Sequence, residues 1–272
     1  FDSVFWTRLG AQVALFLAAG IGTLVILLGN LWLAGRLMPP PDPSRPGGSF
    51  GSLFERLNEA TQQNAQGRGP GRRYPAEEPK TVSFGVEDVP DLTPIARVGL
   101  VALSVLIALT VAGTVASAWE TVLLLQNRVP FSPETASAVV DPIFGRDIGF
   151  FLFELPFLRF VQALFNGLVI AALVVVFTRY LVGATRGSLV FITPVRVHLA
   201  VLGGLFLLSV AFGYQLDKYE LSYSVRGIAT GVSYTDQNAQ FFAYDVLTVL
   251  SGLAAAFLVG AAFTRMIWPL AL

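Results

Sequence analysis

Five long apolar stretches constrain this chain more than any other feature of its sequence. Each reaches the length of about 20 residues that a helix needs to cross the hydrocarbon core of a bilayer. Lipid offers no partner to backbone N–H and C=O groups, so a spanning segment must be a helix or a strand of a closed barrel. Barrel strands are only about 10 residues long, and the stretches therefore predict helices. They cover residues 11–34, 95–119, 161–182, 197–216 and 246–270.

The composition agrees with a membrane protein. Hydrophobic residues make up 54% of the 272 residues, and the 26 glycines come in addition. A soluble domain has about 45–50% apolar residues with glycine included. Charged residues are only 13% of the chain, against about 25% in soluble domains. We therefore predict an all-α integral membrane protein: a polytopic helical bundle with about five transmembrane helices and additional interfacial helices.

Several classes of chemistry are excluded by the residues that the chain lacks. It has no cysteine and one histidine, so disulfides, thiolate nucleophiles, iron–sulfur clusters and HExxH metal sites cannot come from this chain alone. Lys and Arg number 18, as do Asp and Glu, which gives no bias toward nucleic acid. We expect no catalytic residue, no metal site, no cofactor and no nucleic-acid partner.

The spans divide the chain into three regions. The first holds an external N-terminal segment and the first span. The second is a linker-like cytoplasmic loop rich in proline and glycine, in which a capping box of Ser52 and Glu55 predicts a short amphipathic helix at 52–57. The third is a four-span helical bundle with two external segments. The regions are 1–35, 36–94 and 95–272, and the external segments are 120–160 and 217–245.

Residues 148–160 need a separate interpretation. This segment, IGFFLFELPFLRF, is apolar but too short to span, and Glu154 and Pro156 interrupt it. We predict an interfacial or re-entrant helix here.

The distribution of positive charge predicts the orientation. Lys and Arg concentrate on the cytoplasmic side of membrane proteins. The loops 36–94 and 183–196 and the C-terminal end, with their flanks, hold 12 such residues, against 6 on the other side. We therefore expect the N-terminus of this chain to be external and its C-terminus cytoplasmic.

His198 is the one residue inside a span that could bind a cofactor. One interpretation is an axial ligand to a pigment or a haem iron, and the other is a neutral histidine hydrogen-bonded to a neighbouring helix. The second is favoured because one imidazole without a second ligand is weak evidence for a metal. No Asp, Glu or Lys falls at the centre of a predicted span, where an ion-coupled transporter usually needs one.

Charged residues of the two external segments form a second candidate group. We expect them to hold these segments together by ion pairs. They are Asp141, Arg146, Asp147, Asp217, Lys218, Glu220 and Arg226.

Small residues recur at four-residue spacing in three of the spans. This spacing permits close packing of helices, either within the chain or between subunits. The residues are Ala18 and Gly22, Ala200 and Gly204, and Gly252, Ala256 and Gly260.

Two stretches resemble a known family. DPIFGRDIGFFLFELPFLRF (141–160) and LDKYELSYSVRGIATGVSYTD (216–236) are similar to signature stretches of the bacterial uncharacterised protein family 0182. VFWTRLGAQ, near the N-terminus, is similar to the segment that follows that family's first span. The resemblance covers most of the chain except 36–94. It implies a large multi-pass protein of the bacterial cytoplasmic membrane, with further spans on both sides of this chain and a large extracytoplasmic domain.

The resemblance implies an architecture but no activity. One position departs from the family pattern, because Asn238 stands where we expect histidine. The resemblance therefore implies no metal ligand at this position.

We hypothesise a non-enzymatic structural role, as an accessory subunit or scaffold of a membrane assembly. Its partners would be membrane lipids and other membrane-protein subunits. The alternative is a transporter or lipid-handling permease, which would need a lateral opening lined by Asn30, Gln162 or Asn166. An enzyme is the third hypothesis, and its candidate residues would be the same external charged group.

Overall fold

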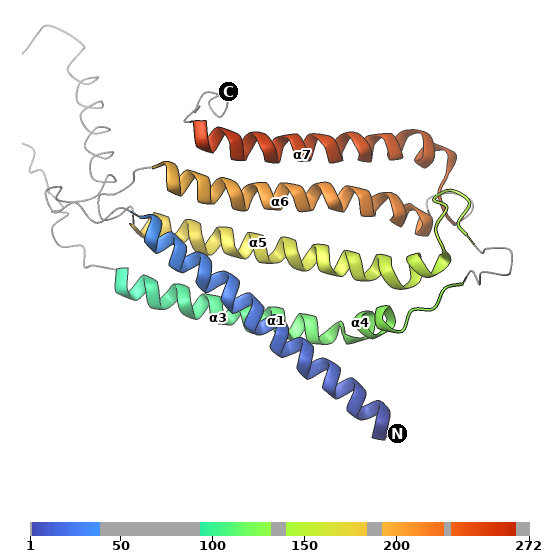
Figure 1. The fold of residues 1–272 in the computed structure, drawn as a ribbon, viewed down its shortest axis with the longest axis horizontal. Helices are drawn as coiled ribbons and strands as arrows, with labels where there is room; N and C mark the ends of the chain where they lie inside the picture. The colour runs from blue at the N-terminus through green and yellow to red at the C-terminus, as the bar shows by residue number, and fades with distance from the viewer. Residues whose placement is uncertain (1, 39–92, 132–139, 184–191, 226–229, 265–272) are drawn as a thin grey trace, which may run out of the picture.

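The computed structural model describes residues 2–38, 93–131, 140–183, 192–225 and 230–264, and Figure 1 shows their arrangement. Within these ranges the chain is helical, and the one β-contact is an isolated bridge between Val140 and Asp147. Five helices are long and apolar enough to cross a membrane. The predicted all-α membrane fold is therefore confirmed. The predicted helix at 52–57 and Arg226 lie outside the described residues.

The helices are α1 (Asp2–Leu37), α3 (Thr93–Ser117), α4 (Trp119–Gln126), α5 (Leu155–Gly183), α6 (Thr193–Glu220) and α7 (Phe241–Thr264). Three short turns of other helix types flank the long helices. They are the π-helical turns η2 (Phe150–Glu154) and η5 (Asp236–Gln240) and the 3-10 turn η4 (Leu221–Tyr223). We call the end of the bundle that carries α4 and these three turns the α4 end; it lies at the right in Figure 1.

Helices α3, α5, α6 and α7 lie in a row, and α1 crosses the face of this row obliquely (Figure 1). Within the row α5 packs on α6 and α6 packs on α7, while α1 packs on α3 and α5. Helix α1 has 36 residues, which corresponds to about 54 Å at 1.5 Å per residue. This exceeds the hydrocarbon thickness of about 30 Å, and a helix of such length fits a bilayer by tilting.

The third span begins earlier than the sequence suggested. Residues 148–160 do not form a separate interfacial or re-entrant helix, because η2 continues directly into α5 as one apolar segment, Phe150–Gly183. Proline lacks the N–H that a helix interior uses and crowds the preceding turn, so it usually kinks or ends a helix. Pro156 directly follows the π-helical turn η2, and the carbonyl oxygen of Phe151, five residues earlier, accepts from the Tyr223 hydroxyl at 2.5 Å. That carbonyl oxygen is thus satisfied without the missing N–H, and the helix continues through the proline.

Much of the segment predicted to be external at 217–245 is helical. Helix α6 and η4 continue to Tyr223, and η5 leads into α7 from Asp236.

Glycines set how closely α6 approaches its neighbours. A Cβ atom added at Gly204 would lie 2.8 Å from Val259 Cγ2 of α7, which is too close for carbon atoms in contact. A Cβ atom at Gly213 would lie 2.7 Å from Gln162 Nε2 of α5. Since lipid tails are as apolar as the side chains, helices in a bilayer associate through such close packing and through interhelical hydrogen bonds. The glycines of α6 thus let it contact α5 and α7 at the same time.

The packed core lies where α1, α5 and α6 meet. Its buried residues are Leu27, Ala34, Ala172, Val176, Tyr180, Val195 and Leu202. Three members of this group, Leu27, Ala34 and Val176, have no exposed surface. Tyr180 is the polar member of the cluster, and its hydroxyl needs a partner inside the bundle.

Substituting Gly204 by alanine should separate α6 from α7. Because one methyl group cannot fit beside Val259, we expect Gly204→Ala to destabilise the protein by about 1–3 kcal/mol. Gly167→Ala is the control, since its Cβ would meet no atom within 4 Å, and it should be neutral or stabilise by about 0.4–1 kcal/mol. Thermal unfolding in detergent measures both; equal melting temperatures would contradict the close approach.

Candidate functional site

A buried chain of hydrogen bonds joins α1, α5 and α6. His198 of α6 is 7% exposed. Its Nδ1 lies 2.8 Å from the Tyr180 hydroxyl oxygen of α5, and its Nε2 lies 3.1 Å from Asn30 Oδ1 of α1. Asn30 Nδ2 donates in turn to the carbonyl oxygen of Ile26, at 2.7 Å. The chain thus begins on α5, passes through α6 and ends on the backbone of α1.

The partners of His198 determine which ring nitrogen carries the proton. An amide oxygen can only accept, so Nε2 must be the protonated nitrogen that donates to Asn30. Nδ1 then accepts from the Tyr180 hydroxyl. The neutral imidazole therefore satisfies both of its nitrogens without any further ligand.

This geometry bears directly on the two interpretations of His198. A ligand to a haem or pigment metal needs a ring nitrogen with a free lone pair. Both nitrogens are engaged by protein groups on other helices. The site as it stands links three helices and offers no nitrogen to a metal.

Ion pairs link α5, α6 and α7 at the α4 end. The guanidinium of Arg159 on α5 pairs with the carboxylates of Asp217 and Glu220 on α6. On the other side of α6, Lys218 Nζ lies 2.8 and 3.0 Å from the two carboxylate oxygens of Asp245 on α7. Ion pairs thereby join α6 to both α5 and α7 at the α4 end of the bundle.

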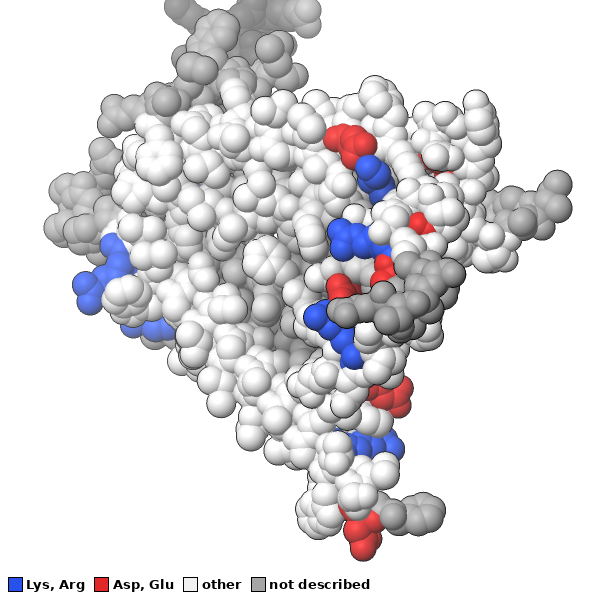
Figure 2. Space-filling view, turned by 45° about the vertical axis from the view of Figure 1, so that its right-hand side comes forward, with Lys and Arg blue, Asp and Glu red and all other residues white. Residues whose placement is uncertain are grey.

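Further polar contacts extend these links. Gln215 Nε2 donates to Thr248 Oγ1 at 2.8 Å and to Asp245 Oδ1 at 3.2 Å, again from α6 to α7. Arg128 Nη1, which follows α4, lies 2.6 Å from Glu154 Oε1 in η2. Figure 2 shows charged side chains in a band at this end and a second, basic group at the opposite edge, while the visible described surface between them is uncharged. The uncharged part is the surface that a bilayer can cover.

Arg146 contacts aromatic rings. Its guanidinium carbon lies 4.6 Å from the centroid of Phe150 and 5.5 Å from that of Tyr219, and its Nη2 is 3.5 Å from the Tyr219 hydroxyl. Phe144 stacks near Tyr219 and Phe241, with centroids 5.1 and 5.3 Å away. The contacts hold the loop before η2 against the ends of α6 and α7.

The predicted carboxylates of this loop bind backbone groups. Asp141 Oδ1 accepts from the N–H groups of Ile143 and Phe144, at 3.0 and 2.7 Å. Asp147 Oδ1 accepts from the N–H of Gly149 at 2.6 Å. Such contacts stabilise a turn. Gly145 in this turn has a left-handed backbone conformation, with φ of 62°.

Sequence reasoning missed three residues of the α4 end: Arg159, Asp245 and Tyr219. A signal for Arg159 was available, because Asp217 and Glu220 are three residues apart and share one face of a helix. That spacing presents two carboxylates to a single cation. No comparable local signal marks Tyr219.

The chemistry of the site follows from these pairings. Among the described residues, no group of three or more His, Asp or Glu side chains could hold a metal ion. The carboxylates of Asp217, Glu220 and Asp245 are paired with cations on neighbouring helices. The arrangement fixes helices relative to one another.

The family can be decided by comparison with known proteins. The sequence pattern of the Uncharacterised protein family (UPF0182) matches residues 1–272. The chain belongs to this family. The family assignment suggested by 141–160 and 216–236 is thus confirmed.

Similar proteins occur in distant bacteria. A UPF0182 protein of Desulforamulus reducens is 29% identical over 97% of this chain and 26% of its own length. One of Kocuria rhizophila is 30% identical over 96% of the chain and 22% of its own length, and one of Trichodesmium erythraeum is 26% identical over 99% and 25%. This chain thus spans about a quarter of the relatives' length. No solved structure matches it.

The hydrogen-bond chain through His198 should behave as one unit. Tyr180→Phe removes the donor to Nδ1 and should cost about 0.6–1.7 kcal/mol, as interhelical hydrogen bonds do in membranes. His198→Leu should make a further Tyr180→Phe substitution less costly, because the partner is already absent. Unfolding of the two single variants and the double variant in detergent measures this coupling. Strict additivity would show that the hydroxyl and the ring do not interact.

Arg159 and Arg128 offer a matched pair of guanidinium groups at the α4 end. The Arg159 side chain is 24% exposed and has two carboxylate partners, whereas that of Arg128 is 59% exposed and has one. Arg159→Gln should cost about 1.5–3 kcal/mol, the range for hydrogen bonds to charged groups. Arg128→Gln should cost about 0–1 kcal/mol. A melting temperature lowered equally by both substitutions would contradict the ranking.

Proposed function

We propose that this five-helix unit is a non-enzymatic scaffold of a membrane assembly, which positions other membrane helices. Those helices belong to the rest of the same protein or to separate subunits. The observation that carries the proposal is that polar and apolar side chains occupy different parts of the unit. Polar side chains link α1, α5, α6 and α7 internally, whereas one flank of α7 is apolar, rich in small residues and uncovered by the described residues.

The uncovered flank of α7 is suited to helix packing. Ala255 faces α6 and is buried, and 100° per residue places Gly252 and Ala256 on one side of that line. A Cβ atom at Gly252 would meet no atom within 4 Å, and Ala256 is exposed. Leu253, on the same flank, is 61% exposed. Small residues beside large apolar ones let a second helix approach closely.

Two of the three polar residues expected to line a transport pathway, Asn30 and Gln162, have partners in the bundle, whereas the buried Oδ1 of Asn166 has none among the described residues. Asn30 belongs to the hydrogen-bond chain through His198. Gln162 Nε2 donates to the Ser209 carbonyl oxygen at 3.3 Å, from α5 to α6. These contacts favour a packed bundle over a transporter with a polar lateral opening.

The length of the relatives supplies candidates for the helices that pack on α7. The chain spans about a quarter of their length, so most of such a protein lies outside this unit. We place the unit in the bacterial cytoplasmic membrane, with the α4 end external, because positive charge is enriched toward the other side. In this position it would act as an accessory subunit or as an anchor for the rest of its own chain.

Photo-crosslinking tests the α7 flank. The full-length protein would carry p-benzoylphenylalanine at position 253 in its native membrane, and we expect an adduct with a protein helix, mapped by mass spectrometry. Ala256→Leu should lower the adduct yield about threefold or more, by blocking close approach. Ala254→Leu is the control, since it lies about 200° around the helix from Ala256.

Two outcomes would contradict the scaffold proposal. One is that the probe at position 253 labels lipid alone. The other is that Ala256→Leu and Ala254→Leu lower the adduct yield equally. Lipid labelling would favour the lipid-handling alternative.

A further inference from the structure

We propose that α1 and α3 form a binding site for a zwitterionic phospholipid at the α4 end. One acyl chain would lie in the groove between the two helices, and the headgroup would lie at the mouth beside Arg8. The inference is independent of the scaffold proposal, because it concerns the opposite side of the bundle from the α7 flank.

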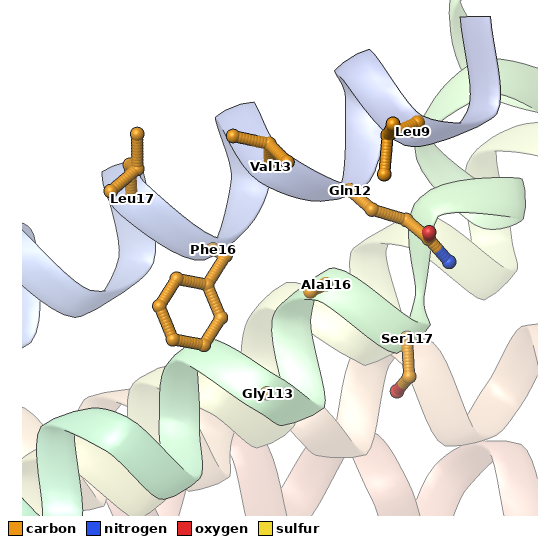
Figure 3. A pocket seen from close by; sticks show the side chains of 8 residues that line it. All are labelled: Leu9, Gln12, Val13, Phe16, Leu17, Gly113, Ala116 and Ser117. Atoms are coloured by element: carbon orange, nitrogen blue, oxygen red, sulfur yellow. The ribbon is translucent and has the colours of Figure 1, made fainter. Parts of the chain in front are cut away.

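The groove forms where α1 leaves the bundle. Toward its N-terminus α1 diverges from α3 (Figure 1), and a cavity of about 460 Å³ opens between them. Figure 3 shows the Phe16 ring directed from α1 toward α3, whose lining residues Gly113 and Ala116 are small. Binding pockets for small molecules have volumes of about 300–1,000 Å³ and mostly apolar walls, so the groove can hold part of a lipid.

The walls of the groove are apolar along most of its length. Leu9, Val13 and Phe16 line it from α1. Gly113 and Ala116 line it from α3, and a Cβ atom at Gly113 would meet no atom within 4 Å. The absence of side-chain bulk on α3 keeps the groove deep. Such walls suit a hydrocarbon chain.

Polar groups gather at one end of the groove. Gln12 and Ser117 are the polar lining residues, and Figure 3 shows the Gln12 amide directed toward α3 near Ser117. Ser117 is the last residue of α3, so this end is the mouth that faces the bilayer surface. The Gln12 amide can donate to an ester carbonyl of a lipid. The groove therefore changes from apolar to polar in the same direction as a phospholipid.

A cation lies one helical turn beyond Gln12. Residues four apart share one helix face, which puts Arg8 next to Gln12 on α1. Its guanidinium carbon lies 5.2 Å from the Trp119 ring centroid, and tryptophan prefers the level of the headgroups. Among the described residues Arg8 forms no ion pair. A guanidinium at this level suits a phosphate diester.

An exposed acidic residue follows Trp119 in the chain. Glu120 directly follows Trp119, at the start of α4, and is exposed. A phosphate on Arg8 and an ammonium group near Glu120 match a phosphatidylethanolamine headgroup in sign. An anionic phospholipid would leave the carboxylate of Glu120 facing a net negative charge, which is unfavourable. The pair of charges thus selects a zwitterionic headgroup.

The test uses the full-length protein in nanodiscs of phosphatidylglycerol that contain a small share of phosphatidylethanolamine with a diazirine on its acyl chain. We expect labelled peptides from residues 9–17 and 113–117. Gly113→Leu should fill the groove and lower this labelling about threefold to fivefold, which corresponds to ~0.6–1 kcal/mol. Gly99→Leu is the matched control, because Gly99 is on α3, is exposed and also has open space at its Cβ.

Two further variants test the headgroup and the acyl-chain parts of the site separately. Arg8→Gln should lower labelling by a similar factor through the headgroup. Val13→Trp fills the groove from the α1 side and serves if Gly113→Leu fails to fold, which thermal unfolding will show. Unchanged labelling in folded Gly113→Leu or Val13→Trp, equal labelling by a phosphatidylglycerol probe, or a protein segment crosslinked into the groove would each overturn the proposal.

Discussion

Hydrogen bonding inside lipid is the constraint on which this structure depends. A bilayer core supplies no water, so each polar side chain within a span needs a partner on its own or a neighbouring helix. The Tyr180 hydroxyl, the His198 ring and the Asn30 amide meet this need for one another. Such directional contacts form only between matching partners, so they help to determine which helices lie together, in addition to the close packing of small residues.

The links are unevenly distributed over the bundle. Helix α6 is bonded to α5 through Arg159, to α7 through Lys218 and to α1 through His198. Helices α1 and α3, by contrast, meet through close packing, with Gly20 against Ala112. Among the described residues no side-chain hydrogen bond or ion pair joins them. The most strongly linked helix is therefore central, and the groove lies between two helices held by packing alone.

The sequence predicted the number and the kind of the helices because hydrophobic length is a local property. It also offered a hydrogen-bonded role for His198, because a lone imidazole in a span needs partners. It could not assign Tyr180 or Asn30 as these partners, because they are distant in sequence. The interpretation of 148–160 as a separate helix was wrong because proline usually interrupts a helix, and only the structure shows that the helix continues through Pro156 after a π-helical turn. Arg159 was missed because its partners lie on another helix.

The excess length of α1 links its position to the thickness of the surrounding bilayer. Its C-terminal half is hydrogen-bonded to α6 at Asn30, and Gly20 packs tightly against Ala112 of α3. A thinner bilayer increases the tilt of a long helix, and the N-terminal half of α1, which diverges from α3, moves most. Gly20 then acts as a pivot, so that thinning moves Leu9 and Val13 away from α3. Membrane thickness is thereby converted into the width of the gap between two helices.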